Sequence, residues 1–259
     1  MKKSQWDKRV ERAARLAERF AYAREVLTFY GDVLKLQQNI FDEIVLQGPP
    51  AEEQFLEQSW LHDASPHLTG LLSLVEQRGP ATLAEQASAL RGQSAPEQAA
   101  MLQSALRGEV TGHSFFARAL LQPYAEWFAV NAAAIVCQGD SFVCPTCKSR
   151  PQAAVLRPEG DGGKRFLLCS LCLTEWGFRR ILCPVCGEEN HRQLPRYTAE
   201  DVDSVRVEAC DACHFYLKSV DMTVDGLAVP LVDEVATVPL DLWAGEHGYK
   251  KIVPNLLGF

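Results

Sequence analysis

Four CxxC pairs lie in the second half of this 259-residue chain, and their spacing constrains the fold more than any other feature. Segment 148–168 separates the first pair from the second and segment 187–209 separates the third from the fourth, whereas the much shorter segment 173–182 separates the second pair from the third. The pairs therefore form an internal repeat, in which each copy spans about 40 residues. The eight cysteines are Cys144, Cys147, Cys169, Cys172, Cys183, Cys186, Cys210 and Cys213.

A CxxC turn places two thiolates on one side of a tight loop, and two facing turns supply four sulfurs in a tetrahedron. We therefore predict one metal site in each copy of the repeat, because pairing across the copies would thread them through each other. The first site takes Cys144, Cys147, Cys169 and Cys172, and the second takes Cys183, Cys186, Cys210 and Cys213. Iron and zinc both accept four thiolates in this geometry, so these residues leave the choice of metal open.

Each copy of the repeat is predicted to form a β-hairpin that leads into its second cysteine pair. Runs with strand propensity flank a turn in both copies. The predicted strands cover 153–156 and 165–168 in the first copy and 193–198, 205–208 and 214–220 in the second.

The chain before the repeat, over 1–140, has helical periodicity instead. One apolar stripe is formed by Trp6, Val10, Ala13, Ala17 and Phe20, and a second by Val26, Tyr30, Val33, Gln37, Ile40, Phe41 and Ile44. The second helix ends at Gly48-Pro49-Pro50, because proline cannot continue a helix. Further helices are predicted over 51–62, 66–78, 81–91, 95–107 and 113–138, and Thr82 with Glu85 and Ser94 with Glu97 have the spacing of capping boxes.

These patterns predict an α+β fold, with a helical N-terminal domain followed by two tandem rubredoxin-like or zinc-ribbon β modules. The predicted divisions are 1–140 for the helical domain, 141–181 and 182–222 for the two metal modules, and 223–259 for a C-terminal extension. We expect one short helix within 233–246. The apolar C-terminal tail should dock, either on the protein's own body or on a partner.

The charge balance argues against a ribbon that binds nucleic acid. The chain holds 26 Lys plus Arg against 33 Asp plus Glu, a net charge of −7, and residues 144–213 hold ten of each sign. Two filled tetrathiolate sites would take the net charge to about −11. We therefore expect no nucleic-acid partner.

Residues 1–24 read as an arginine-rich amphipathic helix without the apolar core of a signal peptide, and no stretch approaches the roughly 20 apolar residues of a membrane span. A cytoplasmic protein without a membrane span is expected, and in a reducing compartment paired cysteines favour metal binding or redox chemistry over disulfides. The basic helix is either an ordinary solvated face or a surface that docks on an acidic body or partner.

A closed four-cysteine site has no open position for water or substrate, so a zinc ion there would be structural. No catalytic residue is predicted, and the protein is not expected to be an enzyme. The alternative is a rubredoxin-like protein whose iron changes oxidation state. His191 and His214 are expected at surface or packing positions, Trp176 between the two modules, and Cys137 in the core or beside the first site as a spare ligand.

The chain resembles the formate dehydrogenase accessory proteins, the FdhE family. The resemblance covers roughly residues 140–259. It is carried by the four pairs in order and by the segments Cys169-Ser-Leu-Cys-Leu-Thr-Glu-Trp176, Arg206-Val-Glu-Ala-Cys-Asp-Ala-Cys213, Tyr216-Leu-Lys218, Leu240-Asp-Leu-Trp-Ala-Gly-Glu246 and Pro254-Asn-Leu-Leu-Gly258. One departure is Lys148, which follows the first pair where such a turn often has glycine, as at Gly187.

This resemblance implies an assembly factor in the cytoplasm that binds the immature molybdenum- or tungsten-dependent catalytic subunit of formate dehydrogenase. It also implies that the eight paired cysteines hold two metal ions, with iron as the family expectation. Whether the chain forms a homodimer is left open by the sequence.

Overall fold

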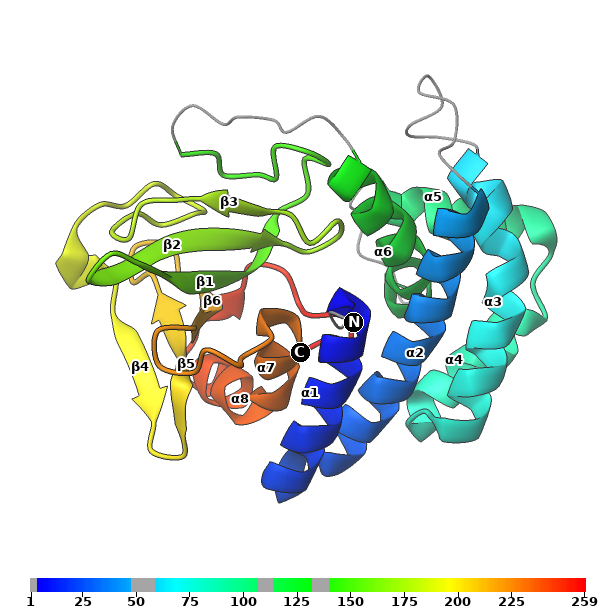
Figure 1. Cartoon of the computed structure of the whole chain (residues 1–259), viewed down its shortest axis with the longest axis horizontal. Helices are drawn as coiled ribbons and strands as arrows, with labels where there is room; N and C mark the ends of the chain where they lie inside the picture. Colours follow the sequence, from blue (N-terminus) through cyan, green and yellow to red (C-terminus); the bar gives the residue numbers. More distant parts are fainter. Residues whose placement is uncertain (1–3, 48–58, 107–113, 132–139) are drawn as a thin grey trace.

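The computed structural model describes residues 4–47, 59–106, 114–131 and 140–259. The N-terminal half is helical and the C-terminal half is built on one mixed β-sheet (Figure 1). This arrangement confirms the predicted α+β class. The helices of the first half are α1 (Gln5–Arg19), α2 (Arg24–Gln47), α3 (Ser59–Arg78), α4 (Ala81–Arg91), α5 (Ala95–Leu106) and α6 (Ser114–Asn131), with a 3-10 turn at Ala21–Ala23 between the first two.

Helix α1 begins at a capping box. The Ser4 hydroxyl accepts a hydrogen bond from the backbone N–H of Asp7, and the Asp7 carboxylate accepts one from the backbone N–H of Ser4. The predicted apolar stripes of α1 and α2 face inward, and Ala13, Tyr30 and Val33 are fully buried. The two helices therefore pack along the seam that their periodicity predicts.

One predicted helix boundary and one predicted cap are wrong, although the helix predicted over 81–91 has the predicted bounds. The break between residues 62 and 66 is absent, because α3 runs through Pro66 and is held by the buried side chains that follow, among them Leu68 and Leu71. The capping box at Thr82 does not form, because α4 begins at Ala81 after Pro80, which places Thr82 inside the first turn. Most of the helix predicted over 51–62, the end of the helix predicted to residue 138, and Cys137 lie outside the described residues.

The sheet joins both copies of the repeat. Its strands are β1 (Pro151–Glu159), β2 (Gly162–Cys169), β3 (Glu175–Gly177), β4 (Arg196–Ala199), β5 (Val202–Ala209), β6 (Phe215–Asp221) and β7 (Lys250–Lys251), in the order β3-β2-β1-β6-β5-β4, with β7 also pairing β6. Each copy is an antiparallel three-stranded meander, β1 to β3 and β4 to β6. The copies meet edge to edge through the parallel pairing of β1 with β6, from Ala153 opposite Lys218 to Leu156 opposite Asp221.

Two short helices, α7 (Pro230–Ala236) and α8 (Val238–Glu246), pack against the sheet where the sequence predicts a single helix. The chain breaks at Thr237 because Pro239 has no N–H to continue the hydrogen-bond ladder of α7. After α8 the chain adds β7 to the sheet and then docks on the protein's own body. There Leu256 is buried, and the Arg118 guanidinium of α6 donates to the carbonyl oxygens of Pro254 and Asn255 at 2.9 and 3.0 Å.

The basic helix α1 docks on acidic side chains of the rest of the chain. Arg9 makes a bidentate pair with Glu126 of α6 at 2.6 and 2.7 Å, and both of these side chains are buried. Arg12 pairs with Asp233 of α7 at 2.5 Å and with Asp225 at 2.6 Å. Of the two alternatives for this helix, the structure has the docked one, which fastens α1 to both halves of the protein.

Candidate metal centres

All four cysteine pairs adopt the same turn. In each pair the backbone N–H of the first cysteine donates to the carbonyl oxygen five residues later. The four bonds are Cys144 to Ser149 at 2.8 Å, Cys169 to Thr174 at 3.0 Å, Cys183 to Glu188 at 2.9 Å and Cys210 to Phe215 at 2.9 Å. Since this bond recurs at four separate places, we infer that the short local sequence, rather than distant packing, sets how each pair presents its sulfurs.

The residue after each pair has a positive φ angle. The angle is 64° at Lys148, 58° at Leu173, 77° at Gly187 and 58° at His214. Lys148 therefore adopts the backbone conformation that glycine adopts at the equivalent place, and its ammonium donates to the carbonyl oxygen of Pro145 at 3.0 Å. The departure at Lys148 leaves the shape of the first turn unchanged, although a side chain in this conformation costs about 1–2 kcal/mol.

The structure gathers the sulfurs into the two groups that the spacing predicts, and within each group all four lie within 4.8 Å of one another. In the first group Cys144 lies 3.5 Å from Cys172 and Cys147 lies 3.3 Å from Cys169. In the second, both corresponding sulfur distances are 3.7 Å. Four sulfurs at about 2.3 Å from a tetrahedral ion lie about 3.8 Å apart, so both groups have the size of such a site.

Backbone amides point at the first sulfur of two of the turns. The N–H of Leu171 donates to Cys169 and the N–H of Val185 donates to Cys183, each over 3.4 Å. Neighbouring thiols also donate to sulfur: hydrogen bonds from Cys144 and Cys169 lower the pKa of Cys147. Burial has the opposite effect at Cys169, whose pKa it raises. The cluster thus favours some thiolates and disfavours others, and a bound cation would remove that conflict.

The first group is enclosed by the protein core. Cys144, Cys169 and Cys172 belong to the apolar core that extends into the helical half. Arg118 of α6 donates to the carbonyl oxygen of Ser170, between the two cysteines of that turn, at 3.2 Å, and to the Gln152 side chain at 3.1 Å. One arginine therefore ties this cysteine turn to the helices and, through its bonds to residues 254 and 255, to the C-terminal tail.

The second group has a positively charged flank. A shallow pocket beside Cys183 and Cys210 is lined by Arg165, Arg180 and Arg196, with Glu208 among them. Arg165 lies 2.9 Å from the Glu208 carboxylate. Burial alone would raise the pKa of Glu208, but the surrounding arginines outweigh burial and lower it. The composition of 144–213 is balanced in charge, yet the fold gathers its arginines where they offset the negative charge of a tetrathiolate.

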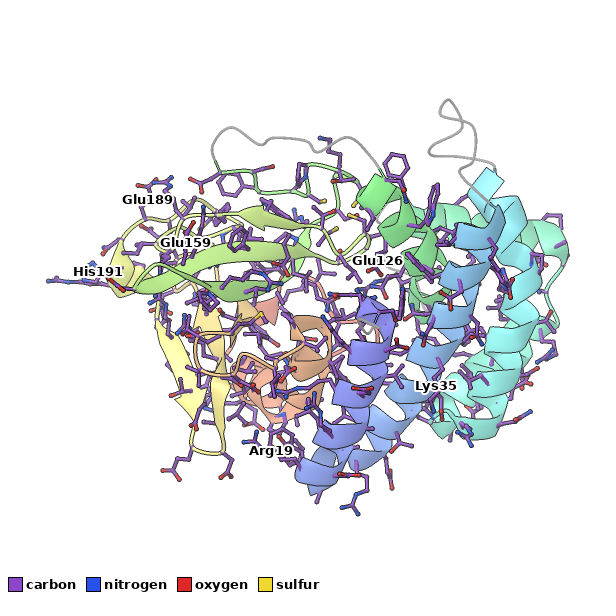
Figure 2. All side chains as sticks on the ribbon, in the orientation of Figure 1. Arg19, Lys35, Glu126, Glu159, Glu189 and His191 are labelled. Atoms are coloured by element: carbon purple, nitrogen blue, oxygen red, sulfur yellow. The ribbon has the colours of Figure 1, made fainter. Side chains whose placement is uncertain are left out.

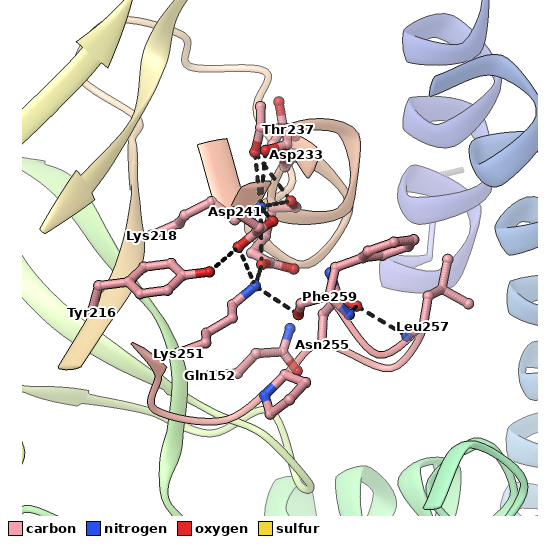
Figure 3. A network of polar contacts seen from close by, with 12 residues as sticks. Gln152, Tyr216, Lys218, Asp233, Thr237, Asp241, Lys251, Asn255, Leu257 and Phe259 are labelled. Carbon is pink, nitrogen blue, oxygen red and sulfur yellow. Dashed lines mark hydrogen bonds and ion pairs between the residues drawn. The ribbon is translucent and has the colours of Figure 1, made fainter. Parts of the chain in front are cut away.

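A buried polar network, which sequence reasoning missed, joins the sheet to α7, α8 and the tail (Figure 3). The Lys218 ammonium lies 2.5 Å from Asp241 and 3.2 Å from Glu234, and the Lys251 ammonium lies 2.8 Å from Asp241 and also contacts Glu234. The Tyr216 hydroxyl donates to Asp241 at 2.9 Å. A lysine within the predicted strand 214–220, between Leu217 and Val220, is the signal that indicates this network, since a buried lysine needs a partner.

Three other residues singled out by sequence have packing or surface positions. Trp176 is buried, but it lies on β3, the edge strand of the first copy that is farthest from the second, and not between the modules; its indole N–H donates to the carbonyl oxygen of Ser141 at 2.8 Å. His191 and His214 are not buried. None of the helices within the described ranges is long and apolar enough to cross a bilayer.

Two family models match the cysteine-rich half of the chain, and one solved structure shares its architecture. A sequence model described as the FdhE central domain matches residues 143–180, and one described as the FdhE C-terminal domain matches residues 181–257. The crystal structure of the FdhE protein from Pseudomonas aeruginosa superposes with a TM-score of 0.79 at 27% identity, over 99% of this chain and 97% of that one. This chain belongs to the FdhE family. Each of the two matched segments of the chain contains one of the four-cysteine clusters.

Two FdhE homologs differ in how much of their length the chain matches. A homolog from Aquifex aeolicus is 29% identical over 94% of this chain and 92% of its own length. One from Pseudomonas putida is 32% identical over 76% of this chain but 64% of its own length. The chain therefore matches nearly the whole length of the Aquifex aeolicus homolog but 64% of the length of the Pseudomonas putida homolog.

Proposed function

We propose that this chain is an accessory factor for the assembly of formate dehydrogenase, which binds the immature molybdenum- or tungsten-dependent catalytic subunit in the cytoplasm. Membership of the FdhE family supports formate dehydrogenase as the client. The observation that supports a metal-stabilised binding scaffold is the pair of four-sulfur clusters on one continuous sheet. Sulfur atoms within these clusters lie 3.3 to 3.7 Å apart. A rigid sheet held at two points is suited to presenting a surface to a client.

Each cluster would hold one metal ion, iron or zinc. The ligands would be Cys144, Cys147, Cys169 and Cys172 in the first site and Cys183, Cys186, Cys210 and Cys213 in the second. A tetrathiolate ion supplies rigidity and, if it is iron, one-electron chemistry. We further propose that the chain divides as predicted, into a helical part over 1–140, metal modules over 141–181 and 182–222, and an extension over 223–259.

Elemental analysis with an absorption spectrum on protein purified without oxygen tests the metal sites. We expect two ions per chain, with thiolate-to-iron bands if they are iron and no visible colour if they are zinc. Complete removal of the metal should unfold residues 144–220 preferentially, because small β modules have small apolar cores of their own. Unchanged circular dichroism and unchanged proteolysis in that region after metal removal would refute a structural role for the ions.

Co-purification with the formate dehydrogenase catalytic subunit tests the client. We expect the tagged chain to retain the subunit and a Cys183→Ser plus Cys186→Ser double variant to lose it. Arg192→Ala is the control, since this side chain is exposed and does not belong to either cysteine cluster. If the unaltered, metal-loaded chain retains no catalytic subunit, the accessory role fails whatever the metal content.

A rubredoxin-like redox activity on the client is the second candidate. The amide hydrogen bonds to Cys169 and Cys183 favour it, because such bonds to sulfur set the reduction potential of iron-thiolate centres. A visible spectrum that bleaches reversibly with dithionite is expected for this function. A zinc-loaded, colourless protein that still supports client assembly would exclude electron transfer by iron. Either function makes the chain a partner of an enzyme rather than an enzyme, and neither involves nucleic acid.

A further inference from the structure

The two cysteine clusters differ in exposure although their turns are alike. The first and third ligands are buried in both clusters. The second ligand is half-buried in the first cluster, as Cys147, but exposed in the second, as Cys186. The fourth is buried as Cys172 and half-buried as Cys213. The second cluster is therefore more exposed than the first at two of its four ligands, Cys186 and Cys213.

The surroundings explain this difference. The first cluster lies in the main apolar core under α6, where Arg118 holds the turn that contains Ser170, and the Thr174 hydroxyl lies 3.1 Å from the Cys172 sulfur. The second cluster belongs to the β4 to β6 half of the sheet. Figure 2 places Glu189 and His191, which follow Cys186 in the chain, at the edge of the molecule opposite helices α3 and α4.

Exposure decides how a four-coordinate thiolate site exchanges its ion. The coordination shell is full, so an external ligand must approach the ion past one of the sulfurs, and reactive cysteines are those that are partly exposed. At the first cluster no ligand is exposed, since Cys147 is half-buried and the other three cysteines are buried. At the second, Cys186 offers a sulfur directly to solvent, and the sulfurs there are also spaced slightly wider, at 3.7 Å.

We propose that the two sites have different tasks, a proposal that rests on the metal sites proposed above. The first site is closed and structural. The second is the exchangeable site, at which Cys186 is the sulfur displaced by an external thiol. In this step a bond forms between the ion and the external sulfur, the bond to the Cys186 sulfur breaks, and the proton of the incoming thiol passes to Cys186. The number of sulfur ligands and the oxidation state of the ion are unchanged.

The test uses the full chain loaded with zinc, with the ions counted first. EDTA should then release the two ions in two phases that differ at least about tenfold in rate. Limited iodoacetamide followed by peptide mass spectrometry should label Cys186 before the cysteines of the first cluster. This labelling uses the unaltered protein, so its result does not depend on any variant folding.

Matched variants assign the phases. Cys186→Ser should remove the fast phase and leave the slow one, whereas Cys147→Ser, at the equivalent position of the first site, should remove the slow phase or prevent folding. Fewer than two ions at saturation would defeat the proposed metal sites themselves. Two ions with a single rate, or faster loss from the first site, would overturn the difference between the sites alone. Labelling of Cys213 before Cys186 would overturn the assignment of Cys186.

Discussion

Left-handed backbone conformation recurs after every cysteine pair, yet glycine occupies only one of these four positions. Lys148 and His214 are held there by the turn that precedes them, because their backbone N–H groups donate to the carbonyl oxygens of Cys144 and Cys210 at 3.0 and 2.8 Å. Three side chains in this region cost about 1–2 kcal/mol each, and this cost must be offset by coordination and packing.

Replacing Lys148 with glycine should therefore stabilise the metal-loaded protein by about 1 kcal/mol, despite the loss of the bond to Pro145. Gly187→Ala, at the equivalent position of the third pair, should destabilise it by a similar amount. A Cβ at Gly187 would meet Phe142 at 3.8 Å, an ordinary contact, so the φ angle and not a clash causes the loss. Urea unfolding of both variants checks this, and changes of the same sign would contradict it.

The buried network makes stability depend on pH. Burial alone would raise the pKa of Glu234, but the charges of Lys218 and Lys251 outweigh burial and lower the pKa to about 2. A carboxylate with a lowered pKa contributes stability that is present above its ordinary pKa of 4.5 and is lost as the pH falls toward 2.

The destabilisation caused by Glu234→Gln should therefore be large at pH 7 and should shrink between pH 4.5 and 2. Taking the difference in unfolding free energy between the variant and the unaltered protein at each pH removes the pH effects that both proteins share, including protonation of the cysteines. The free energy of urea unfolding at several pH values measures it. A difference between the two proteins that is constant with pH would show that Glu234 does not titrate as described.

At the scale of the elements, α1 is held by charge as much as by its apolar stripe. Its stripe packs on α2, while Arg9 and Arg12 on the same helix reach Glu126 and Asp233. Burial raises the pKa of Asp233 even with Arg12 beside it. The carboxylate is therefore stable in this position only while the guanidinium is present.

Removing that guanidinium with Arg12→Met should cost about 3–5 kcal/mol at pH 7, since it leaves Asp233 buried without its partner. Arg15→Met is the control, because Arg15 is an exposed arginine on the same helix and its loss should change stability by less than about 0.5 kcal/mol. Thermal unfolding of both variants provides the comparison. Equal effects would mean that the Arg12 pair contributes nothing specific.

At the scale of the whole molecule, the helical half and the sheet share one apolar core. The parallel pairing of β1 with β6 also makes the two repeat copies one sheet. The metal-loaded protein should therefore unfold in urea as a single cooperative unit. Single-tryptophan variants that retain Trp6 or Trp176 report on the two halves, and their fluorescence transitions should coincide with that of far-UV circular dichroism. Transitions at separate urea concentrations would show two independent domains.

The sequence by itself determined the features that depend on short separations along the chain. Cysteine spacing defined the two clusters, because each forms within one hairpin, and the periodicity of residues 6–44 defined the seam between α1 and α2. The predicted break between residues 62 and 66 failed, because α3 continues through Pro66 and the packing of later residues outweighs the local cost of a proline.

Only the tertiary structure decided how these parts meet. The Arg12–Asp233 pair joins residues 221 positions apart, and the join of β1 to β6 places Ala153 opposite Lys218. The different exposure of Cys147 and Cys186 also comes from the tertiary structure, since their local turns are similar and differ in how much of the rest of the chain packs against them. Such contacts form through packing of the whole chain, and local propensity carries no information about them.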